Sequence, residues 1–181
     1  MGTGEAELLQ AARQGDHEAF ARLVRPSLDT AYRLALRVLG DAAEAEDAVQ
    51  DALYSAWRGL ARFRGGAKFS TWLYRIVWRQ CVDRLRRPQP AALTEQAADV
   101  SFDNDPATRV ETLEAESRVE RALRQLPAAY RTVLTLFYIE DLPIKDVARI
   151  TGLPLGTVKT HLHRARKELR KLLEESEVMQ P

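Results

Sequence analysis

Basic side chains gather in two blocks of this sequence and could bind a polyanion. Residues 62–87 carry eight basic side chains and one acidic side chain, a net charge of +7. Residues 155–171 carry six basic side chains and one acidic side chain, a net charge of +5. Cations concentrated in this way are typical of contacts with phosphates. The sequence therefore predicts two separate contacts with a nucleic acid.

The first basic block is also rich in aromatic residues, and over residues 62–79 it reads RFRGGAKFSTWLYRIVWR. Aromatic rings can receive unstacked bases while neighbouring cations hold the backbone, a combination that favours single-stranded DNA. The alternative is that the rings fill a core and the cations are only a solvated surface. The aromatic residues are Phe63, Phe69, Trp72, Tyr74 and Trp78, and the cations between them are Arg62, Arg64, Lys68, Arg75 and Arg79.

The second basic block overlaps a segment with helix-turn-helix spacing, IKDVARITGLPLGTVKTHL at residues 144–162. Ala148 is small where two helices cross, Gly152 can take the positive φ that reverses the chain, and Val158 fills the space between the helices. Residues near the start of such a second helix reach base edges in the major groove. The alternative is an ordinary helical hairpin with a solvated basic face. The side chains expected outward are Thr157, Lys159, Thr160, His161 and Arg164.

An acidic segment points to a different kind of partner. Residues 41–51 carry five acidic side chains and no basic one, a net charge of −5. Asp47, Gln50 and Asp51 lie at steps of three and four, so they share one face of a predicted helix. An acidic helix face suits docking on basic helices of another protein. A plain solvated face is the alternative for Glu44 and Glu46.

The sequence gives little support to enzymatic chemistry. It has no nucleophile beside a base, no metal-ligand spacing and no phosphate-binding glycine motif. His161 and His163 are two residues apart and point to different helix faces. We therefore expect no catalytic residue, no metal and no cofactor. The single cysteine, Cys81, excludes an internal disulfide and is expected in the core.

The elements that position these residues are predicted to be helices, because apolar residues recur at three- and four-residue steps. The predicted fold class is all-α, with two small helical bundles. The predicted domains are residues 1–88 and 113–175, with a flexible linker at 89–112, where the composition shifts to Pro, Ala, Asp and Thr, and a tail at 176–181. No apolar run approaches the roughly 20 residues of a membrane-spanning helix, and no leader is recognisable, so we expect a cytoplasmic protein without membrane insertion.

Local signals predict where the helices begin and end. Asp16 and Asp41 suit N-caps, Gly40 suits a C-terminal stop, and Ser70 suits the N-cap of a helix that follows two glycines. The predicted inward residues are Leu28, Tyr32, Ala35, Leu36 and Leu39 on one helix and Leu73, Ile76, Val77, Cys81 and Leu85 on another. The predicted helices span residues 5–14, 17–24, 27–39, 42–60, 71–87, 112–126, 128–138, 144–151 and 155–174.

Nearly the whole chain resembles a known family, the extracytoplasmic-function or group 4 sigma factors of bacterial RNA polymerase, within the sigma-70 superfamily. The resemblance rests on LALRVLGDAAEAEDAVQDALYSAWR at 34–58, on FRGGAKFSTWLYRI at 63–76 followed by DRLRR at 83–87, and on residues 126–169. It implies two helical domains, called region 2 and region 4, and a function in promoter-specific transcription initiation. It also implies that neither domain is an enzyme.

The resemblance assigns a partner to each candidate surface. The acidic helix is similar to the region 2 surface that binds the clamp helices of the largest polymerase subunit, through Asp47, Gln50 and Asp51. The region 4 domain is expected on the flap of the second-largest subunit and on promoter DNA. The residues implied at the minus-10 element are Phe63, Arg64, Lys68, Phe69, Ser70, Trp72, Arg75, Trp78, Arg79 and Arg86. Those implied at the minus-35 element are Thr157, Lys159, Thr160, His161 and Arg164, with Arg166 and Lys167 on phosphates.

The chain departs from the family pattern at positions that bear on base preference. Arg79 stands where an Asn is common, Trp78 where a small or basic residue is usual, and His161 where an Arg is common. The base preference at the minus-10 and minus-35 elements therefore cannot be inferred from that of relatives.

The resemblance also implies regulation. An anti-sigma factor is expected to hold the two domains and can keep the chain at the membrane, whereas in holoenzyme the chain would associate with the nucleoid. Two other function classes stay open from the residues alone. One is a regulator that uses only its helix-turn-helix, and the other is an enzyme such as a recombinase.

Overall fold

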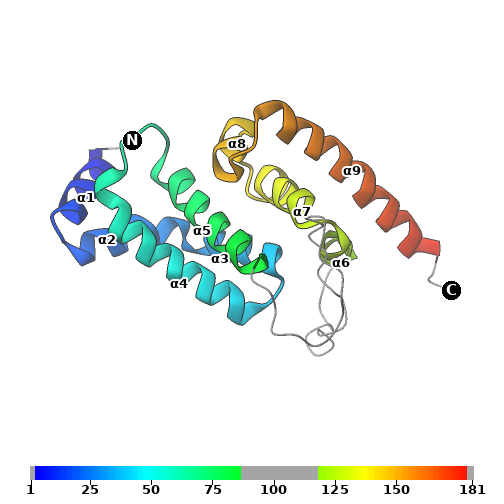
Figure 1. Cartoon of the computed structure of the whole chain (residues 1–181), viewed down its shortest axis with the longest axis horizontal. Coiled ribbons are helices and arrows are strands. Elements are labelled where there is room, and N and C mark those ends of the chain that lie inside the picture. Colours follow the sequence, from blue (N-terminus) through cyan, green and yellow to red (C-terminus); the bar gives the residue numbers. More distant parts are fainter. Residues whose placement is uncertain (1–2, 87–117, 179–181) are drawn as a thin grey trace. The chain divides into compact units, whose positions relative to one another are not determined.

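The computed structural model describes residues 3–86 and 118–178, and within these ranges the chain forms helices and no strand (Figure 1). The all-α prediction is confirmed for this part of the chain. The chain divides into two compact units, of which the first holds the residues up to Arg86 and the second most of those after it. The predicted linker and the predicted helical residues 112–117 lie outside the described residues.

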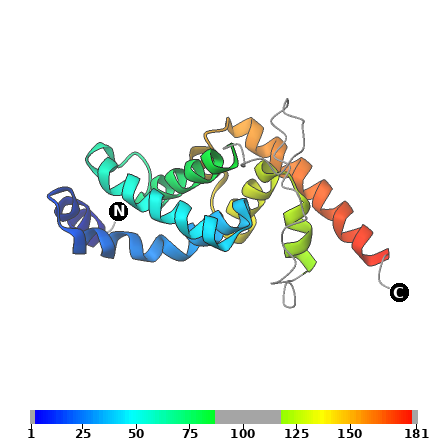
Figure 2. The same ribbon diagram turned by 60° about the horizontal axis from the view of Figure 1, so that its bottom comes forward.

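Within residues 3–86 the chain forms five α-helices and two short 3-10 turns. α3, α4 and α5 pack against one another, and α1 pairs with α2 (Figure 2). The elements are α1 (Thr3–Arg13), α2 (His17–Val24), the 3-10 turn η1 (Arg25–Ser27), α3 (Leu28–Leu39), α4 (Ala42–Gly59), the 3-10 turn η2 (Leu60–Arg62) and α5 (Phe69–Leu85).

Three of the predicted cap residues in this unit are confirmed, and one is wrong. The Asp16 carboxylate accepts hydrogen bonds from the N–H groups of Glu18 and Ala19 at 2.9 Å. Asp41 accepts from the N–H of Glu44 at 3.0 Å, and Gly40 ends α3 with a φ of 71°. Ser70 is not an N-cap, because α5 begins one residue earlier, at Phe69, with Lys68 at the cap position.

The buried faces of α3 and α5 test the predicted core. On α5, Leu73, Val77 and Cys81 are fully buried as predicted, whereas Ile76 and Leu85 are half-buried. On α3 the predicted stripe is partly wrong, because Leu28, Tyr32 and Leu36 are only half-buried. Small side chains allow helices to approach closely, and two of the buried residues are alanines. The buried residues of α3 are Ala31, Leu34, Ala35, Val38 and Leu39.

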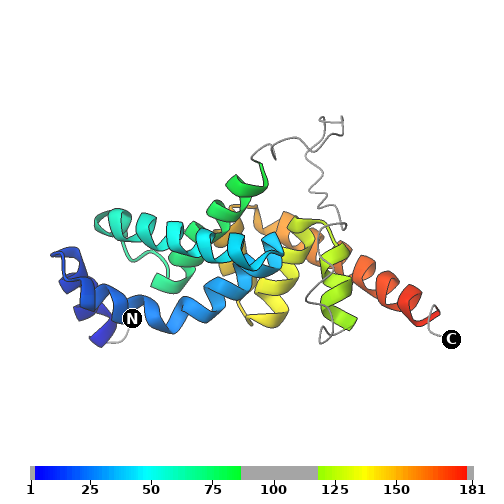
Figure 3. The same ribbon diagram turned by 90° about the horizontal axis from the view of Figure 1, so that it is seen from below.

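Within residues 118–178 the chain forms four α-helices and one π-helical turn. Figure 3 shows α9 as a long helix with α6 and α7 along it. The elements are α6 (Arg118–Gln125), α7 (Ala128–Leu134), the π turn η4 (Thr135–Ile139), α8 (Ile144–Thr151) and α9 (Leu155–Val178).

Two boundaries in this unit differ from the prediction. The helix predicted over 128–138 widens at Thr135, whose carbonyl accepts from the N–H of Glu140 at 2.9 Å, a five-residue step. α9 continues through Val178, so residues 176–178 do not belong to a tail. The last turns are held because Arg118 donates to Ser176 Oγ at 2.9 Å and to the carbonyl of Leu173. Residues 179–181 lie outside the described residues.

The length and hydropathy of the helices bear on whether any of them could span a bilayer. Across residues 3–86 and 118–178, none is both long enough and apolar enough to cross a membrane.

Candidate nucleic-acid and protein interfaces

The acidic face predicted on α4 is present. Asp47, Gln50 and Asp51 are exposed, while the opposite side of α4 is buried through small residues such as Ala48 and Ala52. Sequence reasoning missed an aromatic side chain that continues this face. Tyr54 is 63% exposed, lies three residues after Asp51, and carries the Arg58 guanidinium over its ring at 5.6 Å. The face therefore joins carboxylates, an amide and an exposed ring.

Arg84 also contributes to this face, although its sequence position places it in the first basic block. Its Nη2 lies 2.6 Å from Asp51 Oδ2, and its Nε lies 3.4 Å from Glu44 Oε2. The Arg84 side chain is only 9% exposed, whereas those of Glu44 and Asp51 are 58% and 57% exposed. No local pattern could have revealed this pairing, because Arg84 and Asp51 are 33 residues apart.

Aromatic packing holds both ends of the loop between η2 and α5. Phe63 and Phe69 are buried at its two ends, with ring centroids 5.9 Å apart, and both contact Trp72 at 5.1 and 5.6 Å. Arg13 of α1 donates to the carbonyls of Leu60 and Phe63. The two phenylalanines thus fix the loop and do not present open ring faces to a ligand.

The exposed part of this loop borders an open groove of about 560 Å³. Lys68, Phe69 and Ser70 are among the residues that line it. Arg22 of α2, which sequence reasoning did not single out, also lines this groove, together with the acidic Glu5 of α1. Lys68 and Arg22 are both exposed, so two cations are available at the groove. Arg64 is exposed in the preceding part of the loop.

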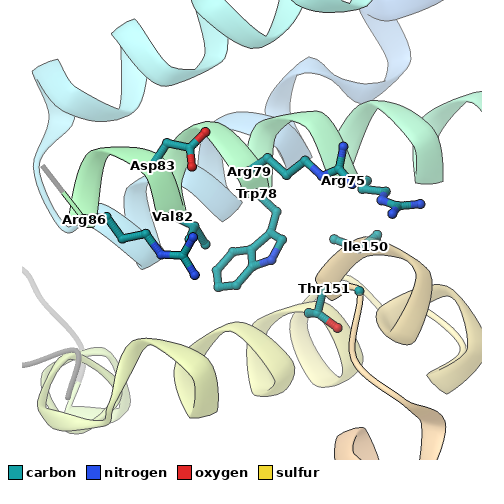
Figure 4. A pocket seen from close by; sticks show the side chains of 9 residues that line it. Arg75, Trp78, Arg79, Val82, Asp83, Arg86, Ile150 and Thr151 are labelled. Atoms are coloured by element: carbon teal, nitrogen blue, oxygen red, sulfur yellow. The ribbon is translucent and has the colours of Figure 1, made fainter. Parts of the chain in front are cut away.

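One side of α5 carries the remaining predicted minus-10 residues. Arg75, Arg79 and Arg86 are exposed, and Trp78 is half-buried. Trp78, Arg79 and Arg86 follow Arg75 by three, four and eleven residues, which places all four on one face, and Figure 4 shows Arg75, Trp78 and Arg86 projecting from the same side of the helix. The structure thus brings together three cations and an indole. This combination can hold a nucleic-acid backbone and stack on a base.

The helix-turn-helix geometry is as the spacing predicted. Gly152 has a φ of 73°, and its N–H donates to the carbonyl of Ala148 at 2.9 Å. Val158 is fully buried, and Leu162 and Ala165 follow it into the core of the second unit. The first half of α9 therefore has its apolar side inward. The predicted residues that are exposed here are Lys159, Thr160, Arg164, Arg166 and Lys167.

Two predicted minus-35 residues, Thr157 and His161, are half-buried and not fully outward. The His161 ring packs against Tyr130 of α7, and its Nδ1 is buried with no hydrogen-bond partner in the part of the chain that the structure describes. Burial lowers the pKa of His161, and the nearby Arg164 lowers it further. Arg166 is fixed differently, because its Nη1 donates to the Tyr138 hydroxyl at 3.2 Å.

The family of this chain is identified by its similarity to known proteins. The sigma-70 region 2 family matches residues 23–90, and the sigma-70 region 4 family matches residues 116–169. The chain is 41% identical to the ECF RNA polymerase sigma factor SigM of Mycobacterium tuberculosis over 171 residues, covering 93% of this chain and 84% of the relative. The chain belongs to the ECF sigma factors. It is also 36% identical to SigW of Bacillus subtilis over 176 residues, covering 91% of this chain and 94% of the relative.

Two solved structures share the fold. CnrH in complex with the cytosolic domain of CnrY matches with a TM-score of 0.68 and 28% identity, covering 95% of this chain and 98% of that one. The sigma factor RpoE of Bartonella quintana, in complex with the anti-sigma factor NepR, matches with a TM-score of 0.66 and 24% identity, covering 86% of this chain and 96% of that one. The latter likeness supports the fold alone.

The function follows from the family. As an ECF sigma factor, the chain binds the RNA polymerase core and promoter DNA and directs promoter-specific transcription initiation. The predicted family resemblance is confirmed. The two other function classes, a stand-alone helix-turn-helix regulator and a recombinase, are set aside, because both regions match sigma-70 families.

Proposed function

We propose that this ECF sigma factor binds its partners through three separate surfaces of the described residues. The acidic face of α4 binds the polymerase, the glycine loop and one side of α5 bind melted minus-10 DNA, and the first half of α9 binds minus-35 duplex. The observation that carries the proposal is the separation of charge within the first unit, where α4 presents carboxylates and α5 presents three exposed arginines. We propose no catalytic step, metal or cofactor for any of these surfaces.

For the polymerase, the proposal is that Asp47, Gln50 and Asp51 dock on the clamp helices of the largest subunit. All three side chains are exposed on α4, so they can contact another helix without a change in the fold. Carboxylates facing a basic partner speed association and fix its register. The second unit is assigned to the flap of the second-largest subunit by the family resemblance.

For the minus-10 element, a flipped base enters beside the loop while α5 holds the strand. Arg64 and Lys68 before α5 are exposed, and Ser70 in the first turn of α5 is half-buried; we assign these three residues to the captured nucleotide. Phe63, Phe69 and Trp72 support this loop by packing. We assign strand phosphates to the α5 cations and base stacking to Trp78. The α5 cations in question are Arg75, Arg79 and Arg86.

For the minus-35 element, the proposal places the start of α9 in the major groove. Lys159, Thr160 and Arg164 are exposed and long or polar enough to reach base edges. Thr157 and His161 lie at the border of this surface, where half-burial limits their reach. Arg166 and Lys167, farther along α9, are assigned to phosphates, which position the helix without reading sequence.

The same surfaces can be covered by a regulator. CnrH was solved in complex with the cytosolic domain of CnrY, and RpoE in complex with the anti-sigma factor NepR. These complexes support an anti-sigma factor as a further partner of this chain. We place the chain in the bacterial cytoplasm, on the nucleoid when in holoenzyme. A membrane-bound anti-sigma factor would hold it at the membrane.

Run-off transcription with purified bacterial core polymerase and a promoter library tests the proposal. We expect specific transcripts only when the chain is added, and their start sites give both promoter elements. Asp47→Arg should abolish these transcripts, and Glu46→Arg, an exposed acid outside the proposed set, should not. Transcripts that persist undiminished with Asp47→Arg would overturn the assignment of the α4 face.

A further inference from the structure

We infer that Arg84 is a positioning residue for polymerase binding, which holds the Asp51 and Glu44 carboxylates in the arrangement that the polymerase meets. The inference rests on the proposed function of the α4 face. Its evidence is the reach of one guanidinium from α5 to two acids of α4, at 2.6 Å to Asp51 and 3.4 Å to Glu44. Two nitrogens of the same planar fork are used, which fixes both its orientation and that of its partners.

Helix geometry separates Arg84 from the DNA-facing cations. Arg84 follows Gln80 by one helical turn, and its Nη1 donates to Gln80 Oε1 at 3.4 Å. Gln80 in turn donates to Ser55 Oγ of α4 at 3.5 Å, so both residues lie on the side of α5 that packs against α4. Arg86 is only two positions away and therefore points to the other side of the helix. One run of basic sequence thus serves two different surfaces.

The contrast in exposure shows which groups stay available to a partner. The Arg84 side chain is 9% exposed and is held among its neighbours, whereas the two acids are more than half exposed. Asp51 uses Oδ2 toward Arg84, so Oδ1 can accept from a cation of the polymerase. A carboxylate that is already ordered loses less conformational entropy when it binds. Arg84 therefore favours binding by fixing the acids in advance.

Arg84 also has an effect that opposes polymerase binding, and this effect depends on salt. Arg84 neutralises part of the negative charge of α4, which weakens attraction of a basic partner at a distance. That attraction is screened over about 8 Å at physiological salt and reaches farther at low salt. We therefore expect positioning to dominate at physiological salt. If Arg84 only stabilised the fold, the effect of its removal on the Kd for polymerase would not depend on the salt concentration in this way.

The experiment measures the Kd of the full chain for core polymerase at about 0.15 M salt and at about 0.05 M salt. Arg84→Met keeps the length of the stem and removes the fork, and we expect it to raise Kd by about three- to tenfold at the higher salt and by less at the lower salt. Arg84→Lys should recover part of the loss. In the Asp51→Asn background, Arg84→Met should add much less than it does alone. Glu46→Gln, a charge change on an exposed acid, is the matched control.

Other outcomes separate this inference from the proposed function. A Kd that is unchanged or lowered by Arg84→Met at the higher salt, while Asp47→Arg abolishes binding, overturns the role of Arg84 and leaves the α4 assignment intact. Binding that is unaffected by Asp47→Arg overturns the α4 assignment itself. Circular dichroism at the temperature of the assay checks that each variant is folded. If Arg84→Met is not folded, Arg84→Gln, which retains hydrogen-bond donors, replaces it. We expect the same direction of change in Kd at each salt concentration.

Discussion

The ring of His161 on α9 packs edge-to-face against the ring of Tyr130 on α7, with centroids 5.4 Å apart. The contact fixes one residue of the proposed minus-35 surface to the helix that supports it. It also removes the histidine partly from water, and burial, assisted by Arg164, lowers the pKa of its imidazole. The lowered pKa favours the neutral imidazole, so His161 offers this surface an aromatic ring and not a permanent charge.

The lowered pKa of His161 predicts how stability changes with pH. The unfolded chain binds a proton at this site more readily than the folded chain, so the contribution of His161 is fully present above its unfolded pKa of about 6.5 and is lost as the pH falls below that value. Thermal unfolding between about pH 5 and pH 8 should show this loss, and His161→Gln should reduce it. His163→Gln, which removes an exposed imidazole from the same helix, is the matched control. Identical profiles for the wild type and His161→Gln would contradict the prediction.

The two acids of the α4 face should respond differently to charge reversal. Asp47→Arg places a cation on an exposed position and should abolish core binding while the unfolding temperature stays the same. Asp51→Arg also places a second guanidinium beside Arg84, so it should lower the unfolding temperature as well. Thermal unfolding and core binding, measured on both variants, check this. Equal unfolding temperatures for the two variants would show that the bridge to Arg84 does not contribute to stability.

The loop before α5 offers a pair of substitutions that separate support from recognition. Phe63→Ala removes a buried ring from the cluster with Phe69 and Trp72 and should cost about 3–5 kcal/mol of unfolding free energy. Arg64→Ala changes an exposed side chain and should leave the unfolding free energy within about 0.5 kcal/mol of wild type. Arg64→Ala should instead weaken binding of minus-10 single-stranded DNA by the holoenzyme. Denaturant titration and strand binding measure the two effects, and a large loss of stability in Arg64→Ala would contradict this division.

The Cys81 thiol should be inert in the folded chain. It is fully buried on α5, and burial raises the pKa of the thiol to about 12, although the nearby Arg84 partly opposes this shift. A thiol reagent at about pH 8 should therefore leave the native chain unmodified and react with the chain in denaturant. Rapid modification of native Cys81, followed by mass spectrometry, would show that α5 opens locally.

Local signals in the sequence were sufficient for three of the four predicted caps and for the helix-turn-helix. Asp16, Asp41 and Gly40 act within a few residues of their own position, and Gly152 and Val158 act within one short motif, so their roles can be read from spacing. The α3 stripe and the start of α5 were misjudged because they depend on packing between helices. The same reason hid the link from Arg84 to Asp51, which are far apart in sequence and meet only when α5 packs against α4.

Two cations of α9 should affect promoter binding in different ways. Arg164 is exposed within the proposed base-reading surface, so Arg164→Ala should cost about 1–3 kcal/mol on a matched minus-35 element and little on a mismatched one. Lys167 is exposed one turn later and assigned to a phosphate, so Lys167→Ala should weaken binding equally on both sequences and reduce the salt slope by about one. Holoenzyme binding to both duplexes at several salt concentrations measures the two patterns. If Lys167→Ala changed the preference between sequences, or if Arg164→Ala changed only the salt slope, the assignment of bases and phosphates along α9 would be reversed.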